Sequence, residues 1–345
     1  MSAVQSEKKV YTLSDIAKEL GVNKATVSKA ISGKGNLSAE TRARILEFID
    51  KCGYKPNAVA QGLARNRTYN IGLMMPDQTG LFDGAFFQDC LSGVCKAASG
   101  SQYDVLMAMD SERSVDNIAR LIDNRKIDGV IAMRSLVKSP IVGFLKEKQV
   151  PFVLIGQTSD KETIIVDNDN ESACQELTTL LIARGVRKMA LLGGDEGNCV
   201  THSRLRGFRA ACDMAGLHSE DLLICLNVVK DNRLNAEKDS SLSEIMDTVL
   251  KNEVDCIICM DDYICNLVMV YLRTNGIRVP EDVKVASFYD SVLLESNIPS
   301  VTSLKFDAME LGKIACEKLI DKLEGRPDSD YALPGYQVIL RDSTN

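Results

Sequence analysis

The sequence predicts a small all-α head followed by a larger α/β body with parallel sheets in two lobes. Its 345 residues are enough for about two or three domains. Three capped helical segments fill residues 12–52, and from residue 70 onward short apolar strands alternate with amphipathic helices. The expected domains are a helix-turn-helix domain over 1–55, a hinge over 56–68 and a body over 69–345.

The composition is that of an ordinary globular chain, with 45% hydrophobic and 26% charged residues. No apolar run approaches the roughly 20 residues of a membrane helix, and the N-terminus lacks the apolar region of a signal peptide. The eleven cysteines are scattered, several of them inside apolar runs such as 254–260, which fits buried thiols in a reducing compartment. We therefore expect a cytoplasmic protein, neither secreted nor membrane-bound.

Charge is distributed unevenly along the chain. Residues 1–67 hold 12 Lys and Arg against 6 Asp and Glu, whereas the remainder holds 29 against 42. A basic head on an acidic body predicts that the head meets a polyanion. Aromatic residues make up only 5% and Trp is absent, which argues against a stacking platform for single-stranded nucleic acid.

Capping signals divide the head into three helices. Thr12 and Asp15 form a capping box, Gly21 makes a tight turn, and Asn23 and Ser38 can each cap the helix that follows. The three helices are expected over residues 12–20, 24–31 and 39–52. Two capped helices around a glycine turn, followed by a third, are typical of a DNA-binding helix-turn-helix.

A fourth, short helix is expected between the head and the body. Pro56 blocks continuation of the third helix, and Asn57 can cap a helix over 58–64. Because so short a helix is marginal in water, we expect it to become ordered only with a partner.

The body follows a repeated strand–helix rhythm, which is typical of parallel sheets covered by helices on both faces. The expected strands are 70–75, 104–109, 128–133, 152–156, 188–193, 255–260 and 283–289, and the expected helices lie near 86–99, 113–125, 171–184, 203–215, 241–251 and 262–275. Changes of course near 160–170 and 297–303 indicate where the chain passes between two lobes.

The sequence resembles the LacI/GalR family of bacterial transcription regulators. TLSDIAKELGVNKATVSKAIS, LSAETRARI and GYKPNAVAQGLA in the first 64 residues carry the resemblance, which extends over essentially the whole chain. It implies that the second helix enters the major groove, with Lys24, Ala25 and Lys29 reading bases. The positions implied to contact phosphates are Thr12, Asn23, Thr26, Ser28, Ser38, Thr41 and Asn57. Leu63 matches a hinge-helix leucine that wedges into the minor groove.

The resemblance also implies that the body looks like a periplasmic sugar-binding protein, with a small-molecule effector between its lobes. Ligands of such sheets bind beyond the carboxyl ends of the strands. Motif matching and this rule together select Arg204, Asp261 and Asp290 as effector residues, and Phe306, Gln157, Asp77 and Phe82 are further candidates. Since Asp261 and Asp262 stand where relatives more often carry Asn-Asp, we expect the extra acid to disfavour an anionic effector.

A homodimer is expected, because one recognition helix reads only a few base pairs. Residues 80–107 resemble the family segment whose helix packs across the dimer axis. The segment 337–345 carries no leucine heptads, so a tetramerisation tail of the family type is not expected.

Three motifs could suggest other chemistry. The run 193–197, GGDEG, resembles the signature of cyclic-dinucleotide synthases, but it follows an expected strand and reads as a loop at the rim of a lobe. Cys256 and Cys259 form a CxxC inside an apolar strand, and His202 adjoins Arg204. We therefore expect no metal, no cofactor and no catalytic residues.

The sequence thus predicts a dimeric, ligand-responsive DNA-binding regulator, a repressor of carbohydrate genes that binds pseudo-palindromic operator DNA and a sugar. A repressor with a purine corepressor and a catabolite-control regulator with a protein partner stay open as alternatives. A cyclic-dinucleotide synthase is the remote one.

Overall fold

The computed structural model describes residues 11–33, 35–54, 62, 67–76, 84–110, 114–228, 240–327 and 330–345. The chain forms two compact units, Met1–Thr68 and Tyr69–Asn345, which we call the head and the body. Apart from Gly62, the predicted hinge helix over 58–64 lies outside the described residues, and so do Asn57, Leu63 and the candidate effector residues Asp77 and Phe82. Within the described part of the chain, no helix has the length and apolar character that crossing a bilayer requires.

Between residues 11 and 54 the structure describes three helices of the head, α1 (Leu13–Glu19), α2 (Lys24–Ser32) and α3 (Ala39–Cys52). Each begins at the cap that the sequence predicts: Thr12 with Asp15 in a capping box, Asn23, and Ser38. The helices enclose a small core of Ile16, Ala17, Val27, Ala30 and Ile45, all buried. Each cap side chain accepts one of the first amides of its helix, which adds stability beyond that of this small core.

The first lobe of the body is a five-stranded parallel sheet in the order β2-β1-β3-β4-β5. Its strands are β1 (Asn70–Pro76), β2 (Asp104–Asp110), β3 (Gly129–Ala132), β4 (Phe152–Ile155) and β5 (Ile165–Val166). Its helices are α5 (Gly84–Gly100), α6 (Asp116–Asp123), α7 (Pro140–Glu147) and, from much later in the chain, α13 (Ala308–Glu324). Alternate strand residues face α5 and α13 on one side and α6 and α7 on the other, which gives one core per face.

The second lobe is a six-stranded sheet in the order β11-β10-β9-β8-β6-β7. Its strands are β6 (Met189–Leu192), β7 (Leu222–Cys225), β8 (Cys256–Cys259), β9 (Lys284–Ser287), β10 (Thr302–Phe306) and β11 (Tyr336–Ile339). Helices α8 (Asn170–Ala183) and α9 (Cys199–Met214) cover one face, and α10 (Ser240–Lys251) and α11 (Asp262–Thr274) cover the other. Shorter elements are η1 (Ser219–Asp221), α12 (Val292–Glu295) and η2 (Asp342–Thr344). The predicted two-part fold is confirmed.

The first passage of the chain between the lobes lies where the sequence predicts it, and the later ones lie elsewhere. The chain leaves the first sheet after β5, within the predicted range of 160–170, but residues 297–303 are not a crossing. They lead into β10, which still pairs with β9 in the second sheet. The chain crosses after β10 to form α13 in the first lobe and returns for β11, which pairs antiparallel with β10. The change of course at 297–303 therefore marks a strand connection within one lobe.

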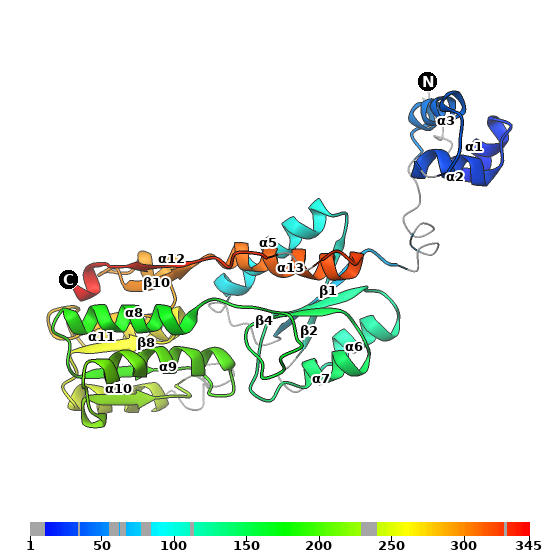
Figure 1. Cartoon of the computed structure of the whole chain (residues 1–345). Coiled ribbons are helices and arrows are strands. Elements are labelled where there is room, and N and C mark those ends of the chain that lie inside the picture. Colours follow the sequence, from blue (N-terminus) through cyan, green and yellow to red (C-terminus); the bar gives the residue numbers. More distant parts are fainter. Residues whose placement is uncertain are drawn as a thin grey trace, which may run out of the picture. The chain divides into compact units, whose positions relative to one another are not determined.

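Helices α5 and α13 cross at unusually close range, side by side in Figure 1. A Cβ on Gly312 would lie 2.1 Å from the Cys90 carbonyl oxygen, and a Cβ on Gly93 would lie 1.9 Å from the Met309 carbonyl oxygen. Only glycine fits at these two positions, so backbone-to-backbone contact attaches the late helix α13 to the first lobe.

Candidate functional site

One face of α2 is exposed to solvent. Lys24, Ala25, Ser28 and Lys29 are exposed, whereas Val27 is fully buried in the head core. Ala30 is buried beside Val27, so the inward and outward faces of α2 are separate. The four exposed residues include both lysines predicted to read bases.

The residues predicted to contact phosphates also shape the helix starts. The Thr26 amide donates to Asn23 Oδ1 at 2.7 Å, and the Thr41 amide donates to Ser38 Oγ at 3.2 Å. Thr12 Oγ1 donates to Asp15 Oδ2 at 2.6 Å. Helix N-termini carry amide donors and partial positive charge, so the starts of α2 and α3 suit phosphate oxygens.

A cavity of about 180 Å³ lies between the two lobes of the body. Its wall comes from the carboxyl ends of strands in both sheets and from the start of α5, as expected for doubly wound sheets. The lining residues are Phe86, Phe87, Met133, Arg134, Ser135, Ile155 and Gly156 from the first lobe, Asp167, Asn168 and Asn170 from the crossing after β5, and Gly194, Asp195, Asn198, Val200, Thr201, Arg204, Met260, Asp261, Asp262 and Tyr289 from the second lobe. We call it the interlobe cavity.

Arg204 and Asp261, both predicted effector residues, line this cavity. The Arg204 guanidinium donates to the Met260 carbonyl oxygen and lies 5.9 Å from the centroid of the Tyr289 ring. Asp261 Oδ1 accepts the Ile264 amide at 2.8 Å and so caps α11. Burial raises the pKa of Asp261 above its usual range.

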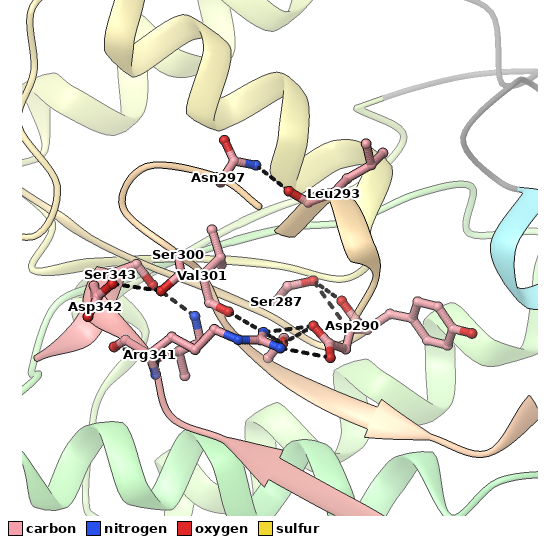
Figure 2. Close-up of polar contacts among 12 residues, drawn as sticks. Ser287, Asp290, Leu293, Asn297, Ser300, Val301, Arg341, Asp342 and Ser343 are labelled. Atoms are coloured by element: carbon pink, nitrogen blue, oxygen red, sulfur yellow. Dashed lines mark hydrogen bonds and ion pairs between the residues drawn. The ribbon is translucent and has the colours of Figure 1, made fainter. Parts of the chain in front are cut away.

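The structure does not bring Asp290, the third predicted effector residue, to the cavity wall. Its carboxylate forms an ion pair with Arg341, with Oδ1 2.7 Å from Nη1 and Oδ2 3.0 Å from Nη2 (Figure 2). Ser303 Oγ also donates to Oδ1 at 2.6 Å. Asp290 thus joins β9 and β10 to the segment that follows β11.

The preceding residue, Tyr289, occupies the cavity wall at this strand end. Its ring meets Phe86 edge-on, with centroids 6.0 Å apart, and stacks with Phe306 at 6.2 Å. Phe306 therefore supports Tyr289 from behind without lining the cavity. Gln157 plays a similar supporting part, because its Nε2 donates to Asp167 Oδ2 at 3.0 Å.

Three buried polar atoms of the cavity residues have no hydrogen-bond partner among the described residues: Asn168 Oδ1, Arg204 Nε and Asp262 Oδ2. Buried polar atoms without partners are rare and costly, and their convergence on one cavity indicates a ligand site. Burial, with a smaller contribution from Asp261, raises the pKa of Asp262 to about 6. Such a perturbed acid in a cleft is typical of functional sites.

Sequence reasoning missed several of these wall residues, including Asp262, Asn168 and Tyr289. The signal was nevertheless present: Asn168 follows β5, Asp262 follows β8 and Tyr289 follows β9. Inspecting every strand end, rather than matching single motif positions, would have found them.

The other motifs have structural explanations. The run 193–197 follows β6, and a Cβ on Gly193 would lie 2.6 Å from Leu226, so packing against that side chain accounts for a glycine there. Cys256 and Cys259 belong to cores on opposite faces of the second sheet, so one ion cannot bind both. His202 Nε2 lies 2.7 Å from the Glu196 carbonyl oxygen, outside the cavity wall.

Two family models match the chain. Residues 12–57 match bacterial regulatory proteins of the lacI family, and residues 178–344 match a periplasmic binding protein-like domain. The HTH-type transcriptional regulator MalR of Streptococcus pneumoniae is 29% identical over 314 residues, which cover 90% of this chain and 92% of the relative. Catabolite control protein A of Staphylococcus aureus is 27% identical over 313 residues, 89% and 91% of the two chains. A transcriptional regulator CelR–cellobiose complex superposes with a TM-score of 0.70 at 26% identity, covering 96% of this chain and 99% of that one.

A helix-turn-helix head joined to a two-lobed body with a cavity between the lobes defines a ligand-binding transcription regulator. The chain belongs to the LacI/GalR family of DNA-binding regulators. The relatives reported above are transcriptional regulators rather than enzymes.

Proposed function

We propose that this protein is a cytoplasmic repressor of carbohydrate genes that binds operator DNA as a homodimer and responds to a saccharide in the interlobe cavity. The convergence of three unpartnered polar atoms on that cavity carries the effector part of the proposal. The CelR relative, which is named as a complex with cellobiose, supports a saccharide ligand. The cavity acts as a binding site without catalysis, and a cytoplasmic location follows from the need to reach the chromosome.

The DNA-binding role rests on the exposed face of α2. Lys24 and Lys29 would donate to guanine edges, and Ala25 would contact a thymine methyl group. The capped starts of α2 and α3, with Thr12, Asn23, Thr26, Ser28, Ser38, Thr41 and Asn57, would hold the phosphates. Leu63 would wedge into the minor groove at the centre of the operator.

Exposed apolar side chains on the body support dimerisation. Met107, on the edge strand β2, is 53% exposed, and Val292 and Ile298, at and beside α12, are 76% and 87% exposed. A two-fold interface that runs along both lobes would cover these apolar side chains. Such a dimer would place two heads on one pseudo-palindromic operator.

The proposed mechanism is a population shift. Effector binding would favour the closed arrangement of the lobes, because the cavity wall comes from both. Closure would change how the two subunits sit against one another and hence the spacing of the two heads.

The experiment is to select operators from random duplexes with the full chain and then titrate saccharides into the complex. We expect a palindromic consensus and a change in operator affinity with at least one saccharide. Failure to select any sequence would refute the DNA-binding role. A sequence-specific protein whose operator affinity changes with no saccharide, but changes with a purine or a protein partner, would refute the saccharide effector.

A further inference from the structure

More acidic than basic side chains line the interlobe cavity. Four aspartates line it, Asp167, Asp195, Asp261 and Asp262, against two arginines, Arg134 and Arg204, which leaves a formal charge of −2 if all six are ionised. Charges interact strongly in an enclosed site because little water screens them. An anionic ligand would therefore meet net repulsion and a cationic ligand net attraction.

Ion pairing within the wall does not relieve this excess. None of the four carboxylates forms an ion pair with a described residue. Asp195 accepts the Gly197 amide and Asp261 accepts the Ile264 amide, both neutral donors. Arg204 uses its Nη1 on the Met260 carbonyl oxygen. The negative charge of the wall is thus left for a ligand.

Of the four aspartates, Asp262 is the one whose carboxylate has a buried oxygen without a hydrogen-bond partner among the described residues. It is 5% exposed, and its Oδ2 accepts no hydrogen bond from a described residue. The neighbouring ionisable groups are Asp261 on the same helix, Arg204 on α9 and Tyr289 after β9. The Ser291 side chain lies near this carboxylate and lowers its pKa, but Oδ2 still has no donor in the described part of the chain. Such a buried oxygen costs free energy that a charged donor restores more fully than a hydroxyl group does.

Aromatic rings complete the surroundings. Phe86 and Phe87 stand at the start of α5 and Tyr289 stands opposite them on the second lobe, and all three line the cavity. Ring faces attract cations, so aromatic rings together with carboxylates are a recurrent setting for ammonium groups. Side chains with hydroxyl and amide groups, Ser135, Asn168 and Thr201, line the same cavity and suit the hydroxyls of a polyol.

We infer that the effector is a saccharide that carries a protonated amine, a hexosamine being the simplest example, and that Asp262 holds its ammonium group beside Tyr289. This inference rests on the proposed effector site and narrows its ligand class. It excludes sugar phosphates, whose charge has the wrong sign for this wall.

The test is calorimetric titration of the full chain at pH 7 with matched sets of ligands. Each set holds a hexosamine, its N-acetyl derivative, the parent hexose and the hexose 6-phosphate, in the gluco and galacto series. We expect one hexosamine to bind about tenfold or more tightly than its parent hexose and N-acetyl derivative, as a charge-assisted hydrogen bond provides, and its phosphate to bind weakest.

Asp262→Asn keeps the shape of the side chain and removes its charge. We expect the preference for the amine to fall to about twofold or less in this variant. Asp213→Asn, at an exposed position near the end of α9 and outside the cavity wall, removes the same charge and should keep the full preference.

The outcomes separate the inference from the proposed function. Equal or tighter binding of the parent hexose or the phosphate overturns the amine inference and leaves the saccharide site standing. An undiminished preference in Asp262→Asn also overturns it. Absence of binding by every member of the sets, from protein that still binds its operator, overturns the amine inference. A response of operator affinity to another saccharide then leaves the saccharide site standing, and no response to any saccharide overturns that site as well. If Asp262→Asn fails to fold, the ratio of hexosamine to hexose affinity in the unmodified chain decides.

Discussion

Asp262 places a negative charge where that charge destabilises the folded protein. Burial raises its pKa from 3.8 to about 6, so at neutral pH the folded state holds an ionised group against its preference. At about 1.4 kcal/mol per pH unit, the penalty at pH 7 is about 3 kcal/mol at most. Binding residues commonly carry such a cost, which the ligand offsets.

The first prediction is that Asp262→Asn stabilises the unliganded protein by about 1–3 kcal/mol at pH 7.5. A raised pKa of a folded-state acid lowers stability as pH rises from about 4 to about 6, so the gain should shrink toward zero at pH 4. Urea denaturation of both proteins across this range measures it. An equal gain at every pH would show that the charge of Asp262 is not the cause.

A second prediction concerns Lys29, which is exposed on α2. If it donates to a guanine, Lys29→Ala relaxes the preference at one operator position by about 1–3 kcal/mol. Competition binding with a series of single-base operator variants measures this. Lys51→Ala, which removes the same charge from an exposed position in α3, is the control. A uniform loss over all sequences in Lys29→Ala would make Lys29 a phosphate contact instead.

At the residue scale, the sequence predicted the location of the cavity, at the carboxyl ends of the strands, better than it predicted the residues that line it. Arg204 and Asp261 were predicted and line the cavity, but Asp290 was chosen where Tyr289 stands. The two are neighbours, and at the end of a strand successive side chains point to opposite sides. A shift of one position therefore exchanges a residue of the cavity wall for one that pairs with Arg341, and only the packing around β10 distinguishes the two.

Among the structural elements, β9, β10 and η2 are joined by the ion pair of Asp290 with Arg341, whose side chains are only 8% and 13% exposed. We predict that Asp290→Ala lowers the free energy of unfolding by about 3–5 kcal/mol, because it leaves Arg341 buried without its partner. Asp282→Ala breaks the exposed pair with Arg278 and should cost less than about 1 kcal/mol. Urea denaturation compares them. If Asp290→Ala were as mild as Asp282→Ala and weakened effector binding, Asp290 would be a ligand residue after all.

The crossing of α5 and α13 gives a fourth prediction. Gly312→Ala should destabilise the body by about 1–3 kcal/mol or more, because its Cβ would meet the α5 backbone. Gly143→Ala, in α7 where a Cβ meets nothing within 4 Å, should stabilise it by about 0.5–1 kcal/mol. Thermal unfolding of the two variants should move in opposite directions, and parallel shifts would contradict the proposed contact.

At this scale the sequence predicted the buried strands well and the later ones poorly. The runs at 188–193 and 255–260 are continuous and apolar, and both became central strands. Strand β10, in contrast, contains Thr302, Ser303 and Lys305, and β11 follows a long connection from α13. Their strand character comes from pairing with β9 and with one another, which no local pattern records.

For the molecule as a whole, the proposed coupling must be reciprocal. If the effector changes operator affinity by some factor, operator DNA must change effector affinity by the same factor. We predict equal factors from fluorescence titrations of operator with and without effector, and of effector with and without operator. The Asp262→Asn variant should reduce both together. Unequal factors would require a further binding event outside this scheme.

The first lobe is assembled from segments that lie far apart in the sequence. This arrangement determines the order in which the parts of the chain can fold during synthesis. The head core lies within residues 11–54, so this unit can fold as soon as it leaves the ribosome. The first lobe cannot, because its core includes Leu311, Ile314 and Leu319 of α13, which are made after nearly all of the second lobe. Until then the apolar face of α5 awaits its partner helix. Nascent chains stalled before residue 308 should therefore carry a folded head and an incompletely folded first lobe. The apolar face of α5 is then the surface to which we expect chaperones to bind.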